Sequence, residues 1–344
     1  MADSELASRA PESDLQEESL EDDKSPLTSR KTLSTDPQPG QPAQVSDHCT
    51  TDRPLPSGVA SEAPSGTLSK WSIDTGAEVE VYVSKPTDYP TTPARLLLLL
   101  TNGTGVHSRN NQHQADLFAR AGYLTIMPDL FAGDPAPNTK PEETPLSSNA
   151  TWLDTVKLKV AETAKSFSLD MWLARHTEET VLPTLQGVLK VAREDYADAV
   201  SHGDGVYAVG YCFGGRYVLL LASGKTHDTP TGQQAQGKAE EGQMITGPQI
   251  KAGVCAHGTL VGRKDVQNIK APIQLVCVED DPLFPEDVLD EGRKSLEEHK
   301  IDHQIEVYKD VPHGFAVVGE YESQKINDAQ SKAFDGMLTW LNAH

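Results

Sequence analysis

Short apolar runs alternate along this chain with stretches whose apolar residues are spaced three and four positions apart. The runs occupy residues 95–100, 123–127, 206–210, 251–256, 273–278 and 304–308. Five successive leucines at 96–100 predict a strand covered on both faces, because a half-exposed strand alternates apolar with polar residues. Helical spacing occurs at 111–121, 182–199, 285–299 and 324–341. This order predicts an α/β fold, a mainly parallel doubly wound sheet flanked by helices.

Other segments add an edge to this sheet and a helical region over it. Residues 68–73 and 79–83 nearly alternate, which predicts an antiparallel pair at the sheet edge. Residues 132–150 are rich in proline and predict a loop. From 152 to 200 the spacing is helical with expected interruptions at 166–169 and at Pro183. We expect a helical excursion over the site, followed by one long helix at 182–199.

Two segments lack a periodic apolar face. Residues 1–46 are rich in Ser, Pro, Asp, Glu and Gln, and such a segment buries too little to offset the entropy of ordering. Residues 224–247 are rich in Gly, Gln and Thr and predict a flexible surface insertion. The chain is therefore expected to consist of a disordered acidic tail, 1–46, and one α/β domain, 47–344.

Charge and cysteine content narrow the classes of partner. The net charge of −21 argues against nucleic acid and anionic membrane surfaces, which need Lys and Arg to replace counterions. No apolar run approaches the length of a membrane span, and the acidic N-terminus lacks signal-peptide features. The four cysteines have no C-x-x-C spacing, which is typical of a reducing compartment and indicates neither a disulfide framework nor a zinc site. We expect a soluble cytoplasmic protein.

The strand at 206–210 runs directly into Gly210-x-Cys212-x-Gly214 and then into a helical stretch. Strand, sharp turn and helix form the elbow that presents a nucleophile, and glycines two positions on either side prevent Cβ clashes in the tight backbone. Cysteine in place of the usual serine supplies a thiolate, a stronger nucleophile. The alternative is that Cys212 is a small buried residue in a Gly-rich connection.

Two later strand ends supply partners for a nucleophile. The strand 273–278 ends in Glu279, Asp280 and Asp281, and the strand around Val307 leads to His313. Nucleophile, acid and histidine at successive strand ends are the order of a catalytic triad on such a sheet. Taken singly, such a histidine is more often an ordinary loop residue, and such an acidic cluster is usually a solvated turn.

Three motifs give the chain a family resemblance. They are Gly-Tyr-Cys-Phe-Gly-Gly at 210–215, Asp-Pro-Leu-Phe-Pro at 281–285 and His-Gly-Phe-Ala-Val at 313–317. With them the chain resembles the dienelactone hydrolase family of α/β hydrolases, especially its fungal-type branch, over residues 47–344. The resemblance implies Cys212 as nucleophile, His313 as general base and Asp281 as the residue that orients it. It implies hydrolysis of a small ester or lactone with no metal and no organic cofactor.

The chain departs from this family at two places that bear on the substrate. Bacterial members have a glutamate where this chain has Asn102, and an amide does not carry that charge. The family's arginine for the substrate carboxylate falls where this chain has Val317 and Val318. Without that cation, a dienelactone carboxylate loses its charge-assisted partner. The resemblance therefore supports hydrolase chemistry for this chain more strongly than it supports a dienelactone as the substrate.

The remaining site candidates surround this predicted triad. We expect the oxyanion hole to use the backbone N–H groups of Phe213 and Gly103, although the glycine is also explained by its turn. Candidates for substrate contact are Asn102, Trp172, His176, His257 and Phe315. Packing is the alternative for Trp172 and His176, and a hydrogen-bonded structural role is the alternative for His257.

Three functions remain open. The first is a cysteine-dependent hydrolase that forms an acyl-enzyme. The second, motivated by Asn102 and the missing arginine, is a catalytically inert α/β-hydrolase-fold protein that binds a ligand or a partner. The third is a thiol redox sensor, against which stands the lack of a resolving cysteine near Cys212 in the sequence. Monomer and homodimer are both compatible with the sequence.

Overall fold

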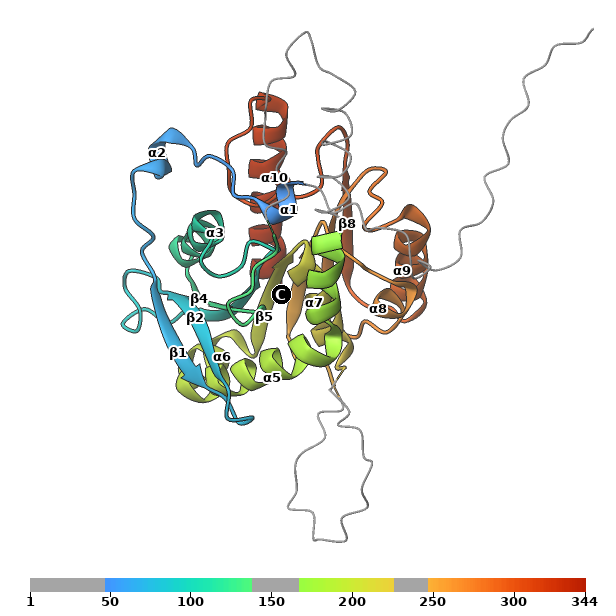
Figure 1. Cartoon of the computed structure of the whole chain (residues 1–344). Helices are drawn as coiled ribbons and strands as arrows, with labels where there is room; N and C mark the ends of the chain where they lie inside the picture. Colours follow the sequence, from blue (N-terminus) through green and yellow to red (C-terminus); the bar gives the residue numbers. More distant parts are fainter. Residues whose placement is uncertain (1–46, 138–166, 226–246) are drawn as a thin grey trace, which may run out of the picture. The chain divides into compact units, whose positions relative to one another are not determined.

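Eight strands form one sheet in the computed structural model, which describes residues 47–137, 167–225 and 247–344 (Figure 1). The strands are β1 (Thr67–Ser72), β2 (Glu78–Ser84), β3 (Arg95–Leu100), β4 (Tyr123–Pro128), β5 (Val206–Tyr211), β6 (Ala252–Ala256), β7 (Ile273–Val278) and β8 (His303–Tyr308). They lie in the order β1-β2-β4-β3-β5-β6-β7-β8. The pairs β1·β2 and β2·β4 are antiparallel and all later pairs are parallel, which confirms the predicted edge pair.

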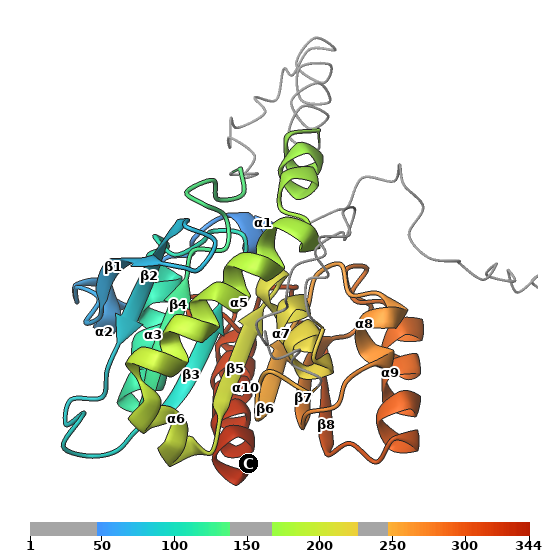
Figure 2. The same cartoon turned by 90° about the horizontal axis from the view of Figure 1, so that it is seen from below.

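Helices cover both faces of this sheet (Figures 1 and 2). They are α1 (Asp47–Thr50), α2 (Ser57–Ala60), α3 (Arg109–Arg120), α5 (Glu178–Asp195), α6 (Ala197–Gly203), α7 (Phe213–Ser223), α8 (Arg263–Gln267), α9 (Glu286–Glu298) and α10 (Gln324–Ala343). Residues 167–175 are helical as well. The unit that comprises residues 40–344 has the doubly wound architecture that the sequence predicts.

The leucine run of β3 shows why that strand is apolar on both faces. Leu96, Leu98 and Leu100 belong to a core with residues of α5 and α7, whereas Leu97 and Leu99 belong to the opposite core with residues of α3 and α10. Successive side chains of a strand point to opposite faces, so a strand between two helical layers needs leucine at every position.

The helical region before the elbow differs from its prediction. The expected single helix at 182–199 is two helices, α5 and α6, which meet at Tyr196 with φ −124° and ψ 41°. Pro183 lies inside α5 and does not end it. At this position, in the second turn, the proline removes one backbone hydrogen bond, and the buried face of the helix offsets that loss. Of the expected interruption at 166–169, the described residues 167–169 are helical.

Several predictions from the sequence concern residues outside the described part of the chain. The predicted tail, 1–46, lies there, as do 226–246 of the predicted insertion and most of the predicted 132–150 loop. Within the described residues, every helix is too short or too polar to cross a membrane.

Parallel strands bring the predicted site residues to one edge of the sheet. Strands β3 and β5 through β8 run in the same direction, so the loops that follow them gather at their carboxyl ends. Those loops carry Asn102, Cys212, His257, Asp281 and His313.

Candidate active site

Cys212 occupies a strained turn between β5 and α7. Its φ of 51° and ψ of −114° lie where a side chain is rarely tolerated. A Cβ atom on Gly210 would stand 2.3 Å from the carbonyl oxygen of Gly214, and one on Gly214 would stand 2.3 Å from that of Leu100 on β3. Both glycines are therefore required for the elbow to form and to pack against the neighbouring strand.

His313 and Asp281 meet at the ends of β8 and β7. The Nδ1 atom of His313 lies 2.6 Å from Oδ2 of Asp281, and both side chains are buried. The other carboxylate oxygen of Asp281 accepts a hydrogen bond from the backbone N–H of Leu283 at 3.0 Å. Neighbouring Glu279 instead pairs with Lys309, and Asp280 is exposed, so Asp281 is the member of the acidic cluster that contacts the histidine.

Thr259 joins the histidine to the cysteine. Its hydroxyl oxygen lies 3.0 Å from Sγ of Cys212 and 3.1 Å from Nε2 of His313, and its backbone N–H donates to the carbonyl of Cys212 at 3.0 Å. The structure thus brings Cys212, Thr259, His313 and Asp281 into one chain of contacts. Thr259 was not among the site residues predicted from the sequence. Its position just after β6, between Cys212 and Asp281 in the chain, could have indicated a place in the site.

The charge state of this group is set by its contacts. Burial alone would raise the pKa of the Cys212 thiol, but hydrogen bonds from Cys49 and His313, the positive charge of His313 and the Thr259 hydroxyl hold that pKa well below its usual value. Burial lowers the pKa of His313, whereas the hydrogen bond to Asp281 and the contact with Cys212 raise it to about 9. A thiolate beside an imidazolium is therefore the stable state at neutral pH.

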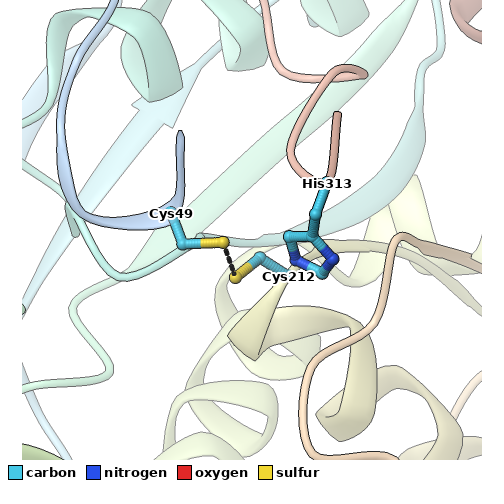
Figure 3. A group of neighbouring side chains, drawn as sticks. All are labelled: Cys49, Cys212 and His313. Carbon is cyan, nitrogen blue, oxygen red and sulfur yellow. Dashed lines mark hydrogen bonds between the residues drawn. The ribbon is translucent and has the colours of Figure 1, made fainter. Parts of the chain in front are cut away.

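Cys49, from helix α1, is the second residue that sequence reasoning missed. Its Sγ atom lies 2.7 Å from Sγ of Cys212, and both side chains are buried (Figure 3). The two cysteines are 163 positions apart in the sequence, so no local pattern relates them.

A small cavity opens beside the two sulfur atoms. Its free volume for a water-sized molecule is about 10 Å³. Apart from the Cys212 sulfur, the lining side chains are uncharged: one thiol, two hydroxyls and otherwise apolar groups, from Cys49, Thr50, Gly103, Ala136, Leu169, Trp172, Leu173, Phe213 and Thr259. Both expected oxyanion donors, Phe213 and Gly103, contribute to this lining. Within the described part of the chain, neither of their backbone N–H groups donates a hydrogen bond.

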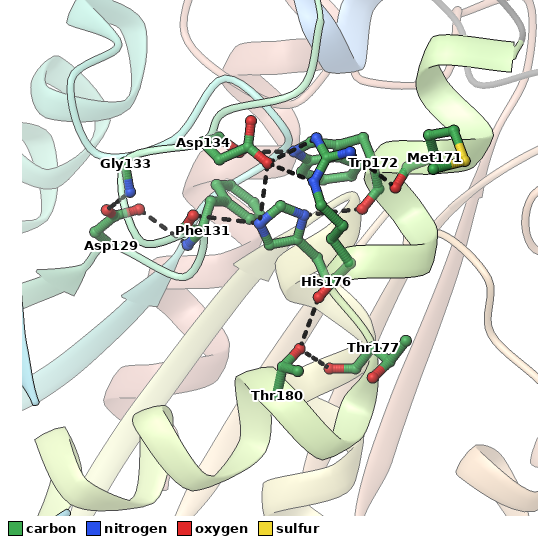
Figure 4. Close-up of polar contacts among 10 residues, drawn as sticks. Asp129, Phe131, Gly133, Asp134, Met171, Trp172, His176, Thr177 and Thr180 are labelled. Atoms are coloured by element: carbon green, nitrogen blue, oxygen red, sulfur yellow. Dashed lines mark hydrogen bonds and ion pairs between the residues drawn. The ribbon is translucent and has the colours of Figure 1, made fainter.

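Trp172 and His176 lie in an aromatic and polar cluster with Phe131 and Asp134 (Figure 4). Trp172 lines the cavity, packs on Phe213 with ring centroids 5.4 Å apart, and donates from Nε1 to the carbonyl of Asp134 at 2.7 Å. His176 contacts the backbone carbonyls of Trp172 and Phe131 and does not line the cavity. Trp172 therefore both packs against Phe213 and lines the cavity, whereas His176 holds the neighbouring backbone segments together.

Three other substrate-contact candidates lie away from the cavity lining. The amide oxygen of Asn102 accepts hydrogen bonds from Thr104 and Asn111, which hold the loop after β3. Phe315 is fully buried against Tyr308. His257 packs behind His313 with ring centroids 5.1 Å apart.

For His257 the sequence offers a hydrogen-bonded structural role as the alternative to substrate contact. Neither ring nitrogen has a hydrogen-bond partner among the described residues. Its burial, together with the charge of nearby His313, holds the pKa of His257 well below its usual value, so the ring is neutral. A neutral ring is the form that can lie against the imidazolium of His313 without charge repulsion.

Cys49, Cys212 and His313 form the one group of metal-ligating side chains found among the described residues, with ligand atoms within 4.8 Å of one another. Tetrahedral zinc with Zn–S bonds of about 2.3 Å would hold two sulfurs about 3.8 Å apart. The observed 2.7 Å is too short for that geometry.

Two arginines near the site form ion pairs with carboxylates. Arg175 pairs with Asp134 at 2.8 Å. Arg216 pairs with Asp265 at 2.8 Å and with Glu178 at 3.1 Å. Val317 is buried at the place where the resemblance leads one to expect an arginine. The anion-binding group expected for a dienelactone is therefore not found among these residues.

Comparisons with known proteins show which family the chain resembles. The model of the dienelactone hydrolase family matches residues 79–231 and 241–344. The hydrolase tropI of Talaromyces stipitatus is 30% identical over 284 residues, which cover 83% of this chain and 92% of that protein. Dienlactone hydrolase 1 of Gibberella moniliformis is 26% identical over 265 residues, 77% of this chain and 84% of that protein. A Klebsiella pneumoniae structure described as a dienelactone hydrolase has a TM-score of 0.56 at 20% identity, covering 81% of this chain and 100% of its own, and supports the fold.

Proposed function

The chain belongs to the dienelactone hydrolase family and is a carboxylic ester or lactone hydrolase, and from this premise we propose that it cleaves a small neutral ester or lactone through an acyl-enzyme on Cys212. The observation that carries the proposal is the continuous series of contacts from Cys212 through Thr259 and His313 to Asp281. A nucleophile, a base and a group that orients the base are the parts that acyl transfer requires.

In the proposed reaction the Cys212 thiolate attacks the acyl carbon, and a carbon–sulfur bond forms. The carbonyl oxygen becomes an oxyanion, which the N–H groups of Phe213 and Gly103 stabilise. Phe213 is the first residue of α7, so the positive end of the helix dipole faces the same charge.

Collapse of this intermediate breaks the bond to the leaving alkoxide, which takes a proton from the His313 imidazolium. His313 then removes a proton from water, which attacks the thioester and releases the acid. Asp281 holds the proton on Nδ1 and so keeps Nε2 directed toward the reacting atoms.

The surroundings of the sulfur favour an uncharged, partly apolar substrate. Apart from the Cys212 thiolate itself, the cavity lining contains no charged side chain, and Trp172 and Phe213 offer aromatic faces to the acyl or alcohol group. Because Arg175 and Arg216 are paired with carboxylates, a substrate carboxylate gains no cation from either of them. An ester is larger than the present cavity, so its binding requires movement of the end of α1, at Cys49 and Thr50, or of residues 167–175.

A substrate screen with one matched pair tests this proposal. Neutral aryl esters and lactones are assayed with the wild type and with Cys212→Ala, and kcat/KM is compared for a neutral ester and a carboxylate-bearing ester of equal size. We expect turnover that depends on Cys212 and favours the neutral member. A preference for the anionic member would contradict the substrate class, and the absence of turnover across the screen would favour the inert binding protein.

A further inference from the structure

The fold places the Cys49 sulfur in direct contact with the Cys212 sulfur. These sulfur atoms are 2.7 Å apart, longer than the disulfide bond of about 2.05 Å but shorter than an ordinary contact between two sulfur atoms. In the sequence, the lack of a second cysteine near Cys212 stands against a redox role. The fold places Cys49 directly against it (Figure 3).

The chain after Cys49 is fastened across the site, so this approach is built into the fold. Asp52 accepts hydrogen bonds from the Ser108 hydroxyl at 2.5 Å and from the Arg109 backbone at 3.1 Å. The carbonyl of Pro54 accepts from the backbone N–H of Glu320 at 2.7 Å. The guanidinium of Arg53 lies 3.7 Å above the ring of Tyr321. These anchors tie the segment to the start of α3 and to the loop that follows His313.

The remaining two cysteines lack the features of this pair. Cys255 and Cys277 are buried in the strands β6 and β7, and burial raises the pKa of both thiols, that of Cys277 to about 12. They are therefore thiols at neutral pH, and oxidants react with thiolates. Cys212 is the thiolate, and Cys49 is its neighbour.

We propose that Cys49 and Cys212 form a redox modification site, in which hydrogen peroxide oxidises Cys212 and Cys49 then closes an intramolecular disulfide. In the first step the Cys212 sulfur attacks the peroxide, so that an S–O bond forms and the O–O bond breaks. The sulfur loses two electrons to the peroxide, and the departing hydroxide takes the His313 proton to become water. In the second step Cys49 attacks the sulfenic sulfur, the S–S bond forms, the S–O bond breaks, and the thiol proton leaves with the hydroxide as a second water.

This modification switches the proposed nucleophile off and protects it. A disulfide leaves Cys212 without a thiolate, and an external dithiol restores it by thiol–disulfide exchange. Without Cys49, the sulfenic acid remains exposed to further peroxide and proceeds to the sulfinic acid, which a dithiol does not reduce. Cys49 is thus the resolving cysteine.

The test treats the full-length reduced protein with hydrogen peroxide and maps its peptides by mass spectrometry without reduction. We expect a cross-linked pair of peptides that contain Cys49 and Cys212, with Cys255 and Cys277 still reduced. Ester turnover, expressed relative to each protein's own untreated rate, should fall and return after dithiothreitol in the wild type. In Cys49→Ser it should fall and stay low, with Cys212 recovered as the sulfinic acid.

Three outcomes would overturn the proposal. In the first, Cys212 of the wild type is oxidised while Cys49 stays reduced. In the second, both cysteines of the wild type stay reduced at peroxide concentrations that oxidise Cys212 in Cys49→Ser. In the third, a chelator restores the lost activity and dithiothreitol does not. The disulfide is detected from peptide masses, so the redox proposal is tested even if the protein turns over no ester. Conversely, ester hydrolysis by Cys212→Ala would remove the proposed function and leave the cross-link result intact.

Discussion

The Nδ1 atom of His313 lies 2.6 Å from Oδ2 of Asp281, although the two residues are 32 positions apart in the chain. Because a carboxylate accepts but does not donate, this contact fixes a proton on Nδ1 and turns Nε2 toward Thr259 and Cys212. The buried carboxylate also stabilises the imidazolium, which in turn stabilises the thiolate. The acid therefore acts on the nucleophile through the histidine.

Replacing this acid gives the first prediction. Asp281→Asn should keep its fold and lower kcat by about a thousandfold or more, since an amide neither fixes the tautomer nor supports the imidazolium. The matched control is Asp280→Asn, an exposed neighbour whose positive φ of 54° asparagine tolerates. Steady-state kinetics and thermal unfolding of both variants decide the matter. Equal losses in the two variants would show that the effect is not specific to the contact with His313.

The protonation states give the second prediction. Since the pKa of Cys212 is lowered and that of His313 is raised to about 9, the thiolate should persist from alkaline pH down through neutrality. It should be lost as the pH falls through the lowered pKa of Cys212. An unperturbed thiol with a pKa of about 8.5 would be only about 3% ionised at pH 7. The ultraviolet thiolate absorbance of the wild type minus that of Cys212→Ala measures this directly, and a signal that rises only near pH 9 would refute it.

Thr259 gives the third prediction. Thr259→Val keeps the shape of the side chain but removes the hydroxyl that contacts both the sulfur and the imidazole. The loss of one hydrogen bond to a charged group should lower kcat by about tenfold and move the thiolate titration to higher pH. Thr259→Ser restores the hydroxyl and should recover most of both properties. If the valine variant titrates like the wild type, Thr259 has no part in stabilising the thiolate.

The elbow glycines give the fourth prediction. In Gly214→Ala the new Cβ would stand 2.3 Å from a backbone oxygen of β3, so the helix or the strand must shift. We expect the free energy of unfolding to fall by about 3 kcal/mol or more. Gly58→Ala is the control, because a Cβ added there would meet nothing within 4 Å and its stability should change by about 1 kcal/mol or less. Urea titrations compare the two, and a harmless Gly214→Ala would mean that the elbow tolerates a side chain.

The sequence predicted those features that a local pattern encodes. Glycines around Cys212 encode the elbow, and the ends of apolar strands locate Asp281 and His313 because parallel strands share a carboxyl edge. The β3 leucines encode a two-sided core in the same way. Each of these inferences needs only a few neighbouring residues and the rules of strand geometry.

The features that the sequence missed depend on contacts between distant segments. Cys49 reaches Cys212 only because residues 52–54 are anchored to α3 and to the loop after His313. The break at Tyr196 and the tolerance of Pro183 reflect packing rather than propensity. Phe315 lies in a motif next to His313, yet its side chain faces the core, which the motif alone does not reveal.

The most direct test of the proposed chemistry is capture of the acyl-enzyme. The wild type is mixed with an activated neutral aryl ester, quenched in acid within the first turnovers, and digested for mass spectrometry. We predict that the acyl group is found on the peptide that contains Cys212, and that it accumulates further in Asp281→Asn, where deacylation lacks a properly oriented base. Turnover of the ester without an adduct on Cys212, together with an undiminished rate in Cys212→Ala, would contradict the proposed mechanism.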